Sequence, residues 1–160
     1  MLKHVLFALT LLAAMTLSGP AAIAAGGGGG DSVPAAPEDP DYTAGKQAVE
    51  AMNWQAALDA FNKVVAKDPG NANAHNYLGY TYRKSGQLDL AFKHYEEALR
   101  LNPKHRGAHE YLGEAYLMVD NLAKAEEQLK ALDKICFFGC EEYNDLKKAV
   151  AEYRQKAANK

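Results

Sequence analysis

The sequence has little of what most catalytic or nucleic-acid-binding proteins need. Its formal net charge is −2, and this near-neutral balance gives no reason to propose nucleic acid as a partner, because phosphate binding requires a clustered basic surface. Ser85 is the only serine after residue 40, and it lacks the G-x-S-x-G surroundings of a nucleophile. Adjacent acid pairs such as Glu96-Glu97 diverge by about 100° on a helix, and no glycine-rich phosphate loop follows a strand. The sequence therefore predicts no catalytic residue, no cofactor and no nucleic-acid partner.

Long apolar runs are also absent. The longest one, Val5–Leu17, is shorter than the about 20 helical residues that cross a bilayer. Lys3 precedes this run, Ser18-Gly19-Pro20 ends it, and Ala22-Ile23-Ala24 fits a signal cleavage site. We interpret residues 1–24 as a bacterial export signal, with an uncleaved anchor as the alternative. We expect a periplasmic or secreted protein that is not stably inserted in the membrane after cleavage.

Residues 25–40 contain five consecutive glycines, several prolines and no large apolar side chain. Such a segment cannot bury enough surface to offset the entropy of ordering. We expect a flexible linker here, followed by one folded domain at residues 41–158.

That domain contains an internal repeat with a period of 34 residues. Small, aromatic and proline residues recur in one register: Gly45, Gly79 and Gly113; Ala57, Ala91 and Ala125; Phe61, Tyr95 and Leu129; Pro69 and Pro103. Each unit also has two apolar stripes at helical spacing, and no segment alternates as a strand would. The repeat therefore predicts stacked pairs of helices.

These positions resemble the tetratricopeptide repeat (TPR) family. The second unit matches best, through Leu78-Gly79, Tyr82, Gly86, Ala91, Tyr95, Ala98 and Pro103. The resemblance implies an all-α fold, a right-handed α-solenoid of three helix-turn-helix repeats at about residues 38–71, 72–105 and 106–139. The amphipathic segment 141–158 is expected to cap the exposed end.

Local signals agree with this arrangement. Asn53 and Asn121 precede apolar helix starts and are expected N-caps. Gly86 is expected to give a tight connection between two helices, and Pro103 cannot continue the helix before it. Paired small residues such as Gly79 and Ala91 allow the two helices of a unit to approach closely.

The resemblance to TPR proteins implies that the first helices of the units line a concave groove that receives a peptide. Projecting the register onto the sequence places nine residues on that wall: Tyr42, Lys46, Val49, Asn76, Tyr80, Arg83, Glu110, Glu114 and Leu117. Some TPR-like proteins hold a C-terminal carboxylate with a lysine, asparagine and arginine cluster. Glu110 and Glu114 depart from that pattern, so we do not carry this activity over.

The two cysteines, Cys136 and Cys140, bracket the expected turn between the third unit and the capping helix. In an exported protein a disulfide is the favoured interpretation, and it would fix the angle of the cap. Metal binding and thiol redox chemistry are the alternatives, although two thiolates alone make an incomplete metal site.

His105 and His109 form an HxxxH pair that could ligate a metal if both lay on one helix. Because His105 follows Pro103-Lys104, we expect it at or before the helix start, where that geometry fails. His75 and His109 share one repeat position and are expected to be packing residues.

The sequence thus favours a non-enzymatic exported adaptor that binds a protein or peptide partner in its groove. One alternative is a metal-binding or thiol-redox accessory protein that uses Cys136 and Cys140. Another is an assembly subunit that associates through its convex face or its cap.

Overall fold

The computed structural model describes residues 39–159. The predicted export signal and nearly all of the predicted linker lie outside these residues. None of the described helices is long and apolar enough to cross a membrane.

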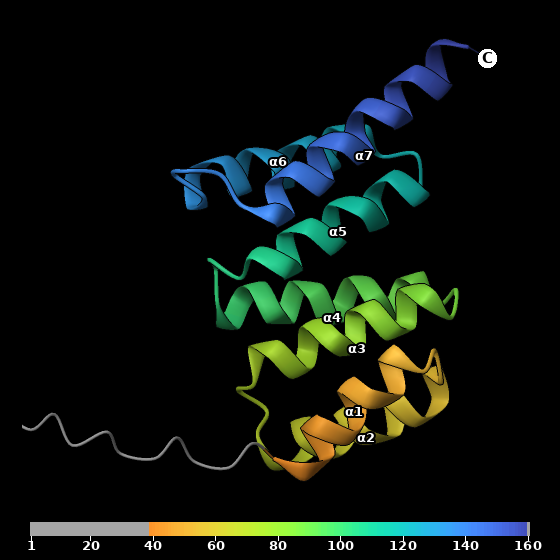
Figure 1. Ribbon diagram of the computed structural model, residues 1–160, viewed down its shortest axis with the longest axis vertical. Helices are drawn as coiled ribbons and strands as arrows, with labels where there is room; N and C mark the ends of the chain where they lie inside the picture. The colour runs from red at the N-terminus through yellow and green to blue at the C-terminus, as the bar shows by residue number, and fades with distance from the viewer. Residues whose placement is uncertain (1–38, 160) are drawn as a thin grey trace, which may run out of the picture. The chain divides into compact units, whose positions relative to one another are not determined.

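Residues 39–159 form seven helices and no strand (Figure 1). In chain order they are α1 Pro40–Glu50, α2 Trp54–Lys67, α3 Ala72–Lys84, α4 Leu88–Leu101, α5 Arg106–Met118, α6 Leu122–Ile135 and α7 Glu141–Ala158. The predicted all-α class, with three helix pairs and a seventh helix, is confirmed.

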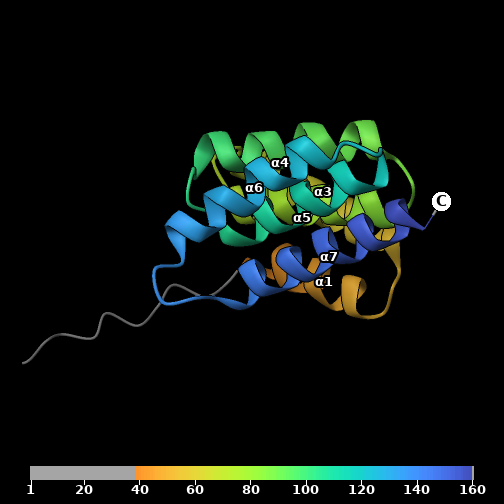
Figure 2. The same cartoon turned by 90° about the horizontal axis from the view of Figure 1, so that it is seen from above.

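The helices are arranged in pairs that stack in sequence order. The closest neighbours are α1 with α2, α3 with α4, and α5 with α6, and α7 packs on both α5 and α6. Figure 2 shows α4 and α6 on one side, α1 and α7 on the other, and α3 and α5 between them. The odd-numbered helices therefore form one continuous face.

Side chains and turns fix where each helix begins. The amide oxygens of Asn53, Asn71 and Asn121 each accept a hydrogen bond from a backbone N–H three residues later. This confirms the two predicted N-caps, Asn53 before α2 and Asn121 before α6, and adds a third, Asn71, before α3. Gln87, which stands at the equivalent place before α4, makes no side-chain cap hydrogen bond. Gly86 adopts φ +79° between α3 and α4, a conformation that glycine adopts without strain.

Within the first two repeats, a glycine of the first helix lies directly against an aromatic ring of the second. A Cβ atom on Gly45 would meet Phe61 at 2.7 Å, and one on Gly79 would meet Tyr95 at 2.5 Å. Both rings are completely buried. These contacts explain the 34-residue recurrence of glycine and aromatic residues, because only glycine admits the ring at this distance.

The third repeat solves the same packing problem differently. Leu129 stands where the first two repeats have an aromatic ring, and it is only partly buried. Gly113 instead contacts Leu146 of α7, which would lie 2.6 Å from an added Cβ. The capping helix thus supplies the side chain that covers the third glycine.

The turn between α6 and α7 is closed by a disulfide between Cys136 and Cys140. Cys136 ends α6 and packs against the last hydrophobic cluster, and Cys140 is the N-cap residue of α7. Gly139 in this turn adopts φ +85°, a conformation that glycine adopts without strain. Phe137 and Phe138 lie in this turn and are solvent-exposed, with 86% and 97% of their surface accessible.

We predict that Gly79→Ala destabilises the domain by about 1–3 kcal/mol, because the added methyl group collides with the buried Tyr95 ring and outweighs the helix propensity gained. Urea unfolding followed by far-UV circular dichroism measures the change. Gly107→Ala is the control, since its added Cβ would meet no side chain closer than 3.4 Å. Equal stabilities of the two variants would contradict the role assigned to Gly79.

Candidate functional site

The face formed by the odd-numbered helices contains two hollows. The first, of about 440 Å³, lies among α1, α3, α5 and the start of α7. The second, of about 520 Å³, lies among α3, α5 and the middle of α7. Tyr111 lines both, so the hollows adjoin and form one groove.

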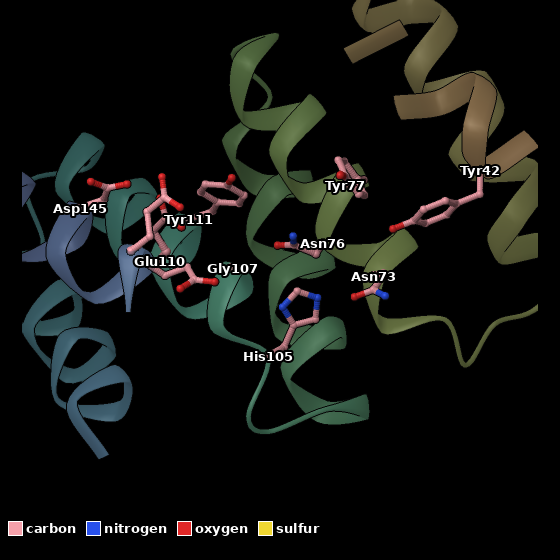
Figure 3. A pocket seen from close by; sticks show the side chains of 11 residues that line it. Tyr42, Asn73, Asn76, Tyr77, His105, Gly107, Glu110, Tyr111 and Asp145 are labelled. Carbon is pink, nitrogen blue, oxygen red and sulfur yellow. The ribbon is translucent and has the colours of Figure 1, made fainter. Parts of the chain in front are cut away.

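We call the first the acidic hollow. Its charged lining residues are four carboxylates, and no lysine or arginine lines it: Glu110, Glu141, Glu142 and Asp145. Tyr42, Tyr77 and Tyr111 supply aromatic walls. Figure 3 shows that these side chains come from α1, α3, α5 and α7 and surround one space.

Glu110 is the most buried of these carboxylates, with 8% of its surface exposed. Burial raises the pKa of its carboxyl to about 8. Three neighbouring carboxylates add to the rise, those of Glu114, Asp145 and Glu142, while the Arg83 guanidinium opposes it. Among the described residues, no basic side chain forms an ion pair with Glu110.

Two buried polar atoms of the acidic hollow have no hydrogen-bond partner among the described residues: Asn76 Oδ1 and His105 Nε2. Asn76 is only 7% exposed, and a buried acceptor left unpaired costs about 1–3 kcal/mol. His105 Nδ1 accepts the backbone N–H of Ala108 at 3.1 Å. In the neutral ring the proton therefore sits on Nε2, which makes that atom an unpaired donor.

We call the second the Arg83 hollow. The Arg83 guanidinium lies 5.5 Å from the Tyr80 ring centre and 5.4 Å from that of Tyr111. It forms an ion pair with Glu114 at 2.7 Å and donates a hydrogen bond to the Tyr95 hydroxyl at 3.3 Å. Its charge is therefore neutralised within the fold. Lys84 also lines this hollow, and its ammonium group lies 5.7 Å from the Tyr80 ring centre.

Seven of the nine residues predicted for the groove line these hollows. Tyr42, Asn76 and Glu110 line the acidic hollow, and four line the Arg83 hollow: Tyr80, Arg83, Glu114 and Leu117. Lys46 and Val49 line neither. Lys46 extends over the Tyr42 ring, and Val49 packs against the first hydrophobic cluster.

The sequence reasoning missed the contribution of α7 and of several neighbours on α3 and α5. The missed residues are Asn73, Tyr77, Lys84, His105, Gly107, Tyr111, Met118, Glu141, Glu142, Asp145 and Ala149. The spacing of Tyr77 and Tyr111, one repeat apart and next to predicted groove residues, is a signal that could have found two of them.

The histidines have structural partners. His105 is the N-cap residue of α5, as predicted. His109 contacts the Gln128 amide at 2.8 Å and the Pro103 carbonyl oxygen at 3.0 Å. Residues 39–159 contain no group of three or more side chains that could hold a metal ion.

In the second repeat His75 takes the place of His109, and its second partner is His94 where the third repeat has Gln128. His75 Nε2 lies 3.2 Å from the Pro69 carbonyl oxygen, and its Nδ1 lies 3.1 Å from His94 Nδ1. Because the carbonyl can only accept, His75 carries its proton on Nε2 and His94 donates to it. Burial first, and then the charge of His75, lowers the pKa of His94 to about 4.

Comparison with known proteins identifies the repeat. Residues 72–105 match the family model described as tetratricopeptide repeat. The chain is 42% identical over 63 residues to the uncharacterized protein ycf37 of Pyropia yezoensis, which is 39% of this chain and 30% of that protein. It is 38% identical over 76 residues to ycf37 of Guillardia theta, or 48% of this chain and 42% of that protein. The chain thus spans less than half the length of these curated relatives.

Solved structures share the fold. The TPR2B domain of yeast Sti1, in a complex with pHsp70, superposes with a TM-score of 0.67 at 18% identity, covering 72% of this chain and 94% of that one. SycD, a type III secretion translocator chaperone of Yersinia enterocolitica, gives 0.67 at 18% identity over 74% and 83% of the two chains. The first TPR of Spaghetti (RPAP3), bound to the HSP90 peptide SRMEEVD, gives 0.63 at 19% identity over 70% and 89%.

We predict that His94→Gln removes an acid-sensitive element. The pKa of His94 is about 4 in the folded chain and about 6.5 in the unfolded chain. Between these two pH values the unfolded chain binds a proton at His94 and the folded chain does not. Stability therefore falls as the pH drops through this range, and the variant should gain about 1 kcal/mol at pH 5, since water screens the exposed part of the ring.

Thermal unfolding of both proteins at pH 5 and pH 8 tests this. The third repeat already has glutamine, Gln128, at the equivalent place, so the substitution should fit. A stability difference that is the same at both pH values would contradict the prediction.

We predict the opposite pH trend for Glu110→Gln. The raised pKa of Glu110 means that the folded chain holds its proton up to about pH 8, whereas the unfolded chain releases it near pH 4.5. The wild type therefore loses stability as the pH rises through this interval, and the variant does not.

The variant should be more stable than the wild type by about 1–2 kcal/mol at pH 8.5 and equally stable at pH 4. Chemical unfolding at the two pH values measures this. A variant that is less stable at pH 8.5 would show that the Glu110 carboxylate has a partner inside the fold.

Proposed function

We propose that this tetratricopeptide repeat protein is an exported adaptor that binds an extended segment of a protein or peptide partner in the groove of its odd-numbered helices. The observation that carries the proposal is the pair of adjoining hollows, of about 440 and 520 Å³. Each has the size of a pocket that encloses a few side chains.

The walls of the groove suit a peptide. The tyrosine rings of α3 and α5 offer rigid apolar area that loses little entropy on binding, and the exposed Met118 can serve as an adaptable anchor. The unpaired Asn76 acceptor and His105 donor match the N–H and C=O groups of a peptide backbone. Because the groove is already formed, little of the binding energy is spent on ordering it.

Two structural neighbours support the same use of the fold. The Sti1 domain forms a complex with pHsp70, and the Spaghetti domain binds the HSP90 peptide SRMEEVD. At 18% and 19% identity they support the fold, and their ligands are not transferred to this chain.

Export is part of the proposal and rests on two observations. Residues 1–24 have the composition of a cleavable signal, and Cys136 and Cys140 form a disulfide, which persists in oxidising compartments. While they are bonded, the two sulfurs offer no thiolate to a metal, and Cys136 packs against the core. We therefore assign them to fixing the turn before α7.

We predict that a partner cross-links to the groove and not to the opposite face. A photoreactive amino acid is placed at Tyr80 or Met118 in the groove, and at Lys93 on α4 or Lys130 on α6 as matched exposed controls. After irradiation of intact cells, adducts recovered from the periplasmic fraction should form from the groove positions at several times the yield of the controls. Adducts formed only from Lys93 or Lys130 would contradict the groove and favour assembly through the even-numbered helices.

A further inference from the structure

The acidic hollow differs from the rest of the groove because, among the described residues, all of its charged lining residues are carboxylates. Glu110 comes from α5 and Asp145 from α7, on the same side of the hollow (Figure 3), and Glu142 of α7 also lines it. Among the described residues, neither Glu110 nor Asp145 has an ion-pair partner, and Glu142 is paired only with Arg106, at 3.4 Å. The hollow therefore carries an excess of negative charge that the fold itself does not neutralise.

A second and independent observation points to a missing donor. Asn76 Oδ1 is buried, has no partner among the described residues and lies on a residue that is only 7% exposed. Figure 3 shows the Asn76 amide directed into the hollow, toward the side on which Glu110 and Tyr111 lie. Buried acceptors are nearly always satisfied in folded proteins, so this oxygen marks the place of a ligand's N–H group.

We propose that the acidic hollow binds a cationic nitrogen group of the partner, the ammonium or guanidinium of a lysine or arginine residue or the amine of its N-terminus. This proposal rests on the adaptor function proposed above and adds the chemical class that one end of the groove selects.

The remaining features of the hollow fit such a group better than an inorganic cation. Tyr42, Tyr77 and Tyr111 provide ring surface for the carbon stem of the side chain and for the cation itself. His105 Nε2 is an unpaired donor, which requires an acceptor such as a backbone carbonyl. A basic residue within a peptide brings both the cation and the carbonyl.

Glu110 gives the binding a pH dependence. Its neighbours are Glu114 on the same helix, Glu142 and Asp145 on α7 and Arg83 on α3. Burial with these carboxylates raises its pKa to about 8, so a bound cation must displace the Glu110 proton near neutral pH. Burial also lowers the pKa of His105 below its ordinary value. Affinity for a lysine or arginine side chain, which keeps its charge in this range, should therefore rise between pH 6 and pH 9.

The test uses the full chain and an array of synthetic octapeptides of randomised sequence, N-acetylated so that side chains supply the only positive charge. The wild type should enrich peptides with lysine or arginine. A parallel array with free N-termini and no basic side chain separates the two sources of the cation, and enrichment in either array supports the proposal.

The variant Glu110→Gln/Asp145→Asn removes two facing carboxylates. It should bind the enriched basic peptides at least about tenfold more weakly, because a desolvated charge loses its partners, and it should lose the rise in affinity from pH 6 to pH 9. The control Glu96→Gln/Asp133→Asn removes the same charge from exposed positions on α4 and α6 and should bind as the wild type does.

The possible failures are distinguishable. The cation site is wrong, and the adaptor function stands, in either of two cases. In the first, the wild type binds peptides without preferring basic ones, and Tyr80→Ala weakens that binding. In the second, the variant Glu110→Gln/Asp145→Asn binds basic peptides as tightly as the wild type does. If neither array yields a peptide whose binding depends on Tyr80 or on the hollow, the groove itself is not a peptide site and both proposals fall.

Discussion

The architecture depends on one repeated contact, a glycine on the first helix of a pair pressed against a large side chain. Gly45 meets Phe61, Gly79 meets Tyr95 and Gly113 meets Leu146 at distances that leave no room for a Cβ atom. This contact sets how closely the helices of a pair approach. It also fixes where the odd-numbered helices lie relative to their supports, and hence the shape of the groove that they form.

The electrostatics of the groove follow from that geometry. Packing α7 against α5 places the carboxylates at the start of α7 opposite Glu110. Burial and the neighbouring carboxylates disfavour the ionised form of Glu110, and its pKa is raised for this reason. Among the described residues Arg83 is the one arginine that lines either hollow; it is ion-paired with Glu114 and only partly opposes the rise in the pKa of Glu110. An acidic peptide such as the one bound by the Spaghetti domain would meet like charge at this end.

The sequence predicted the fold well because a 34-residue period fixes helix pairing, and local signals such as Asn53 and Asn121 fix helix starts. Seven of the nine residues that it projects onto the groove line the two hollows, since the second repeat provides a clear register for α3 and α5. Val49 of the shorter α1 packs against the first hydrophobic cluster instead. The sequence did not predict that α7 lines the groove, because a capping helix lies outside the period and its rotation about its own axis depends on how Leu146 reaches Gly113.

The dual role of α7 has a consequence for how such a protein can diversify. Leu146 and Val150 hold the helix on the core, while Glu142 and Asp145, whose positions on the helix adjoin theirs, line the acidic hollow. The side chains that anchor α7 and those that would contact a ligand at the proposed site are thus different residues of one helix. Substitutions at Glu142 and Asp145 would change the chemistry of the proposed site and leave the packing of the repeats in place.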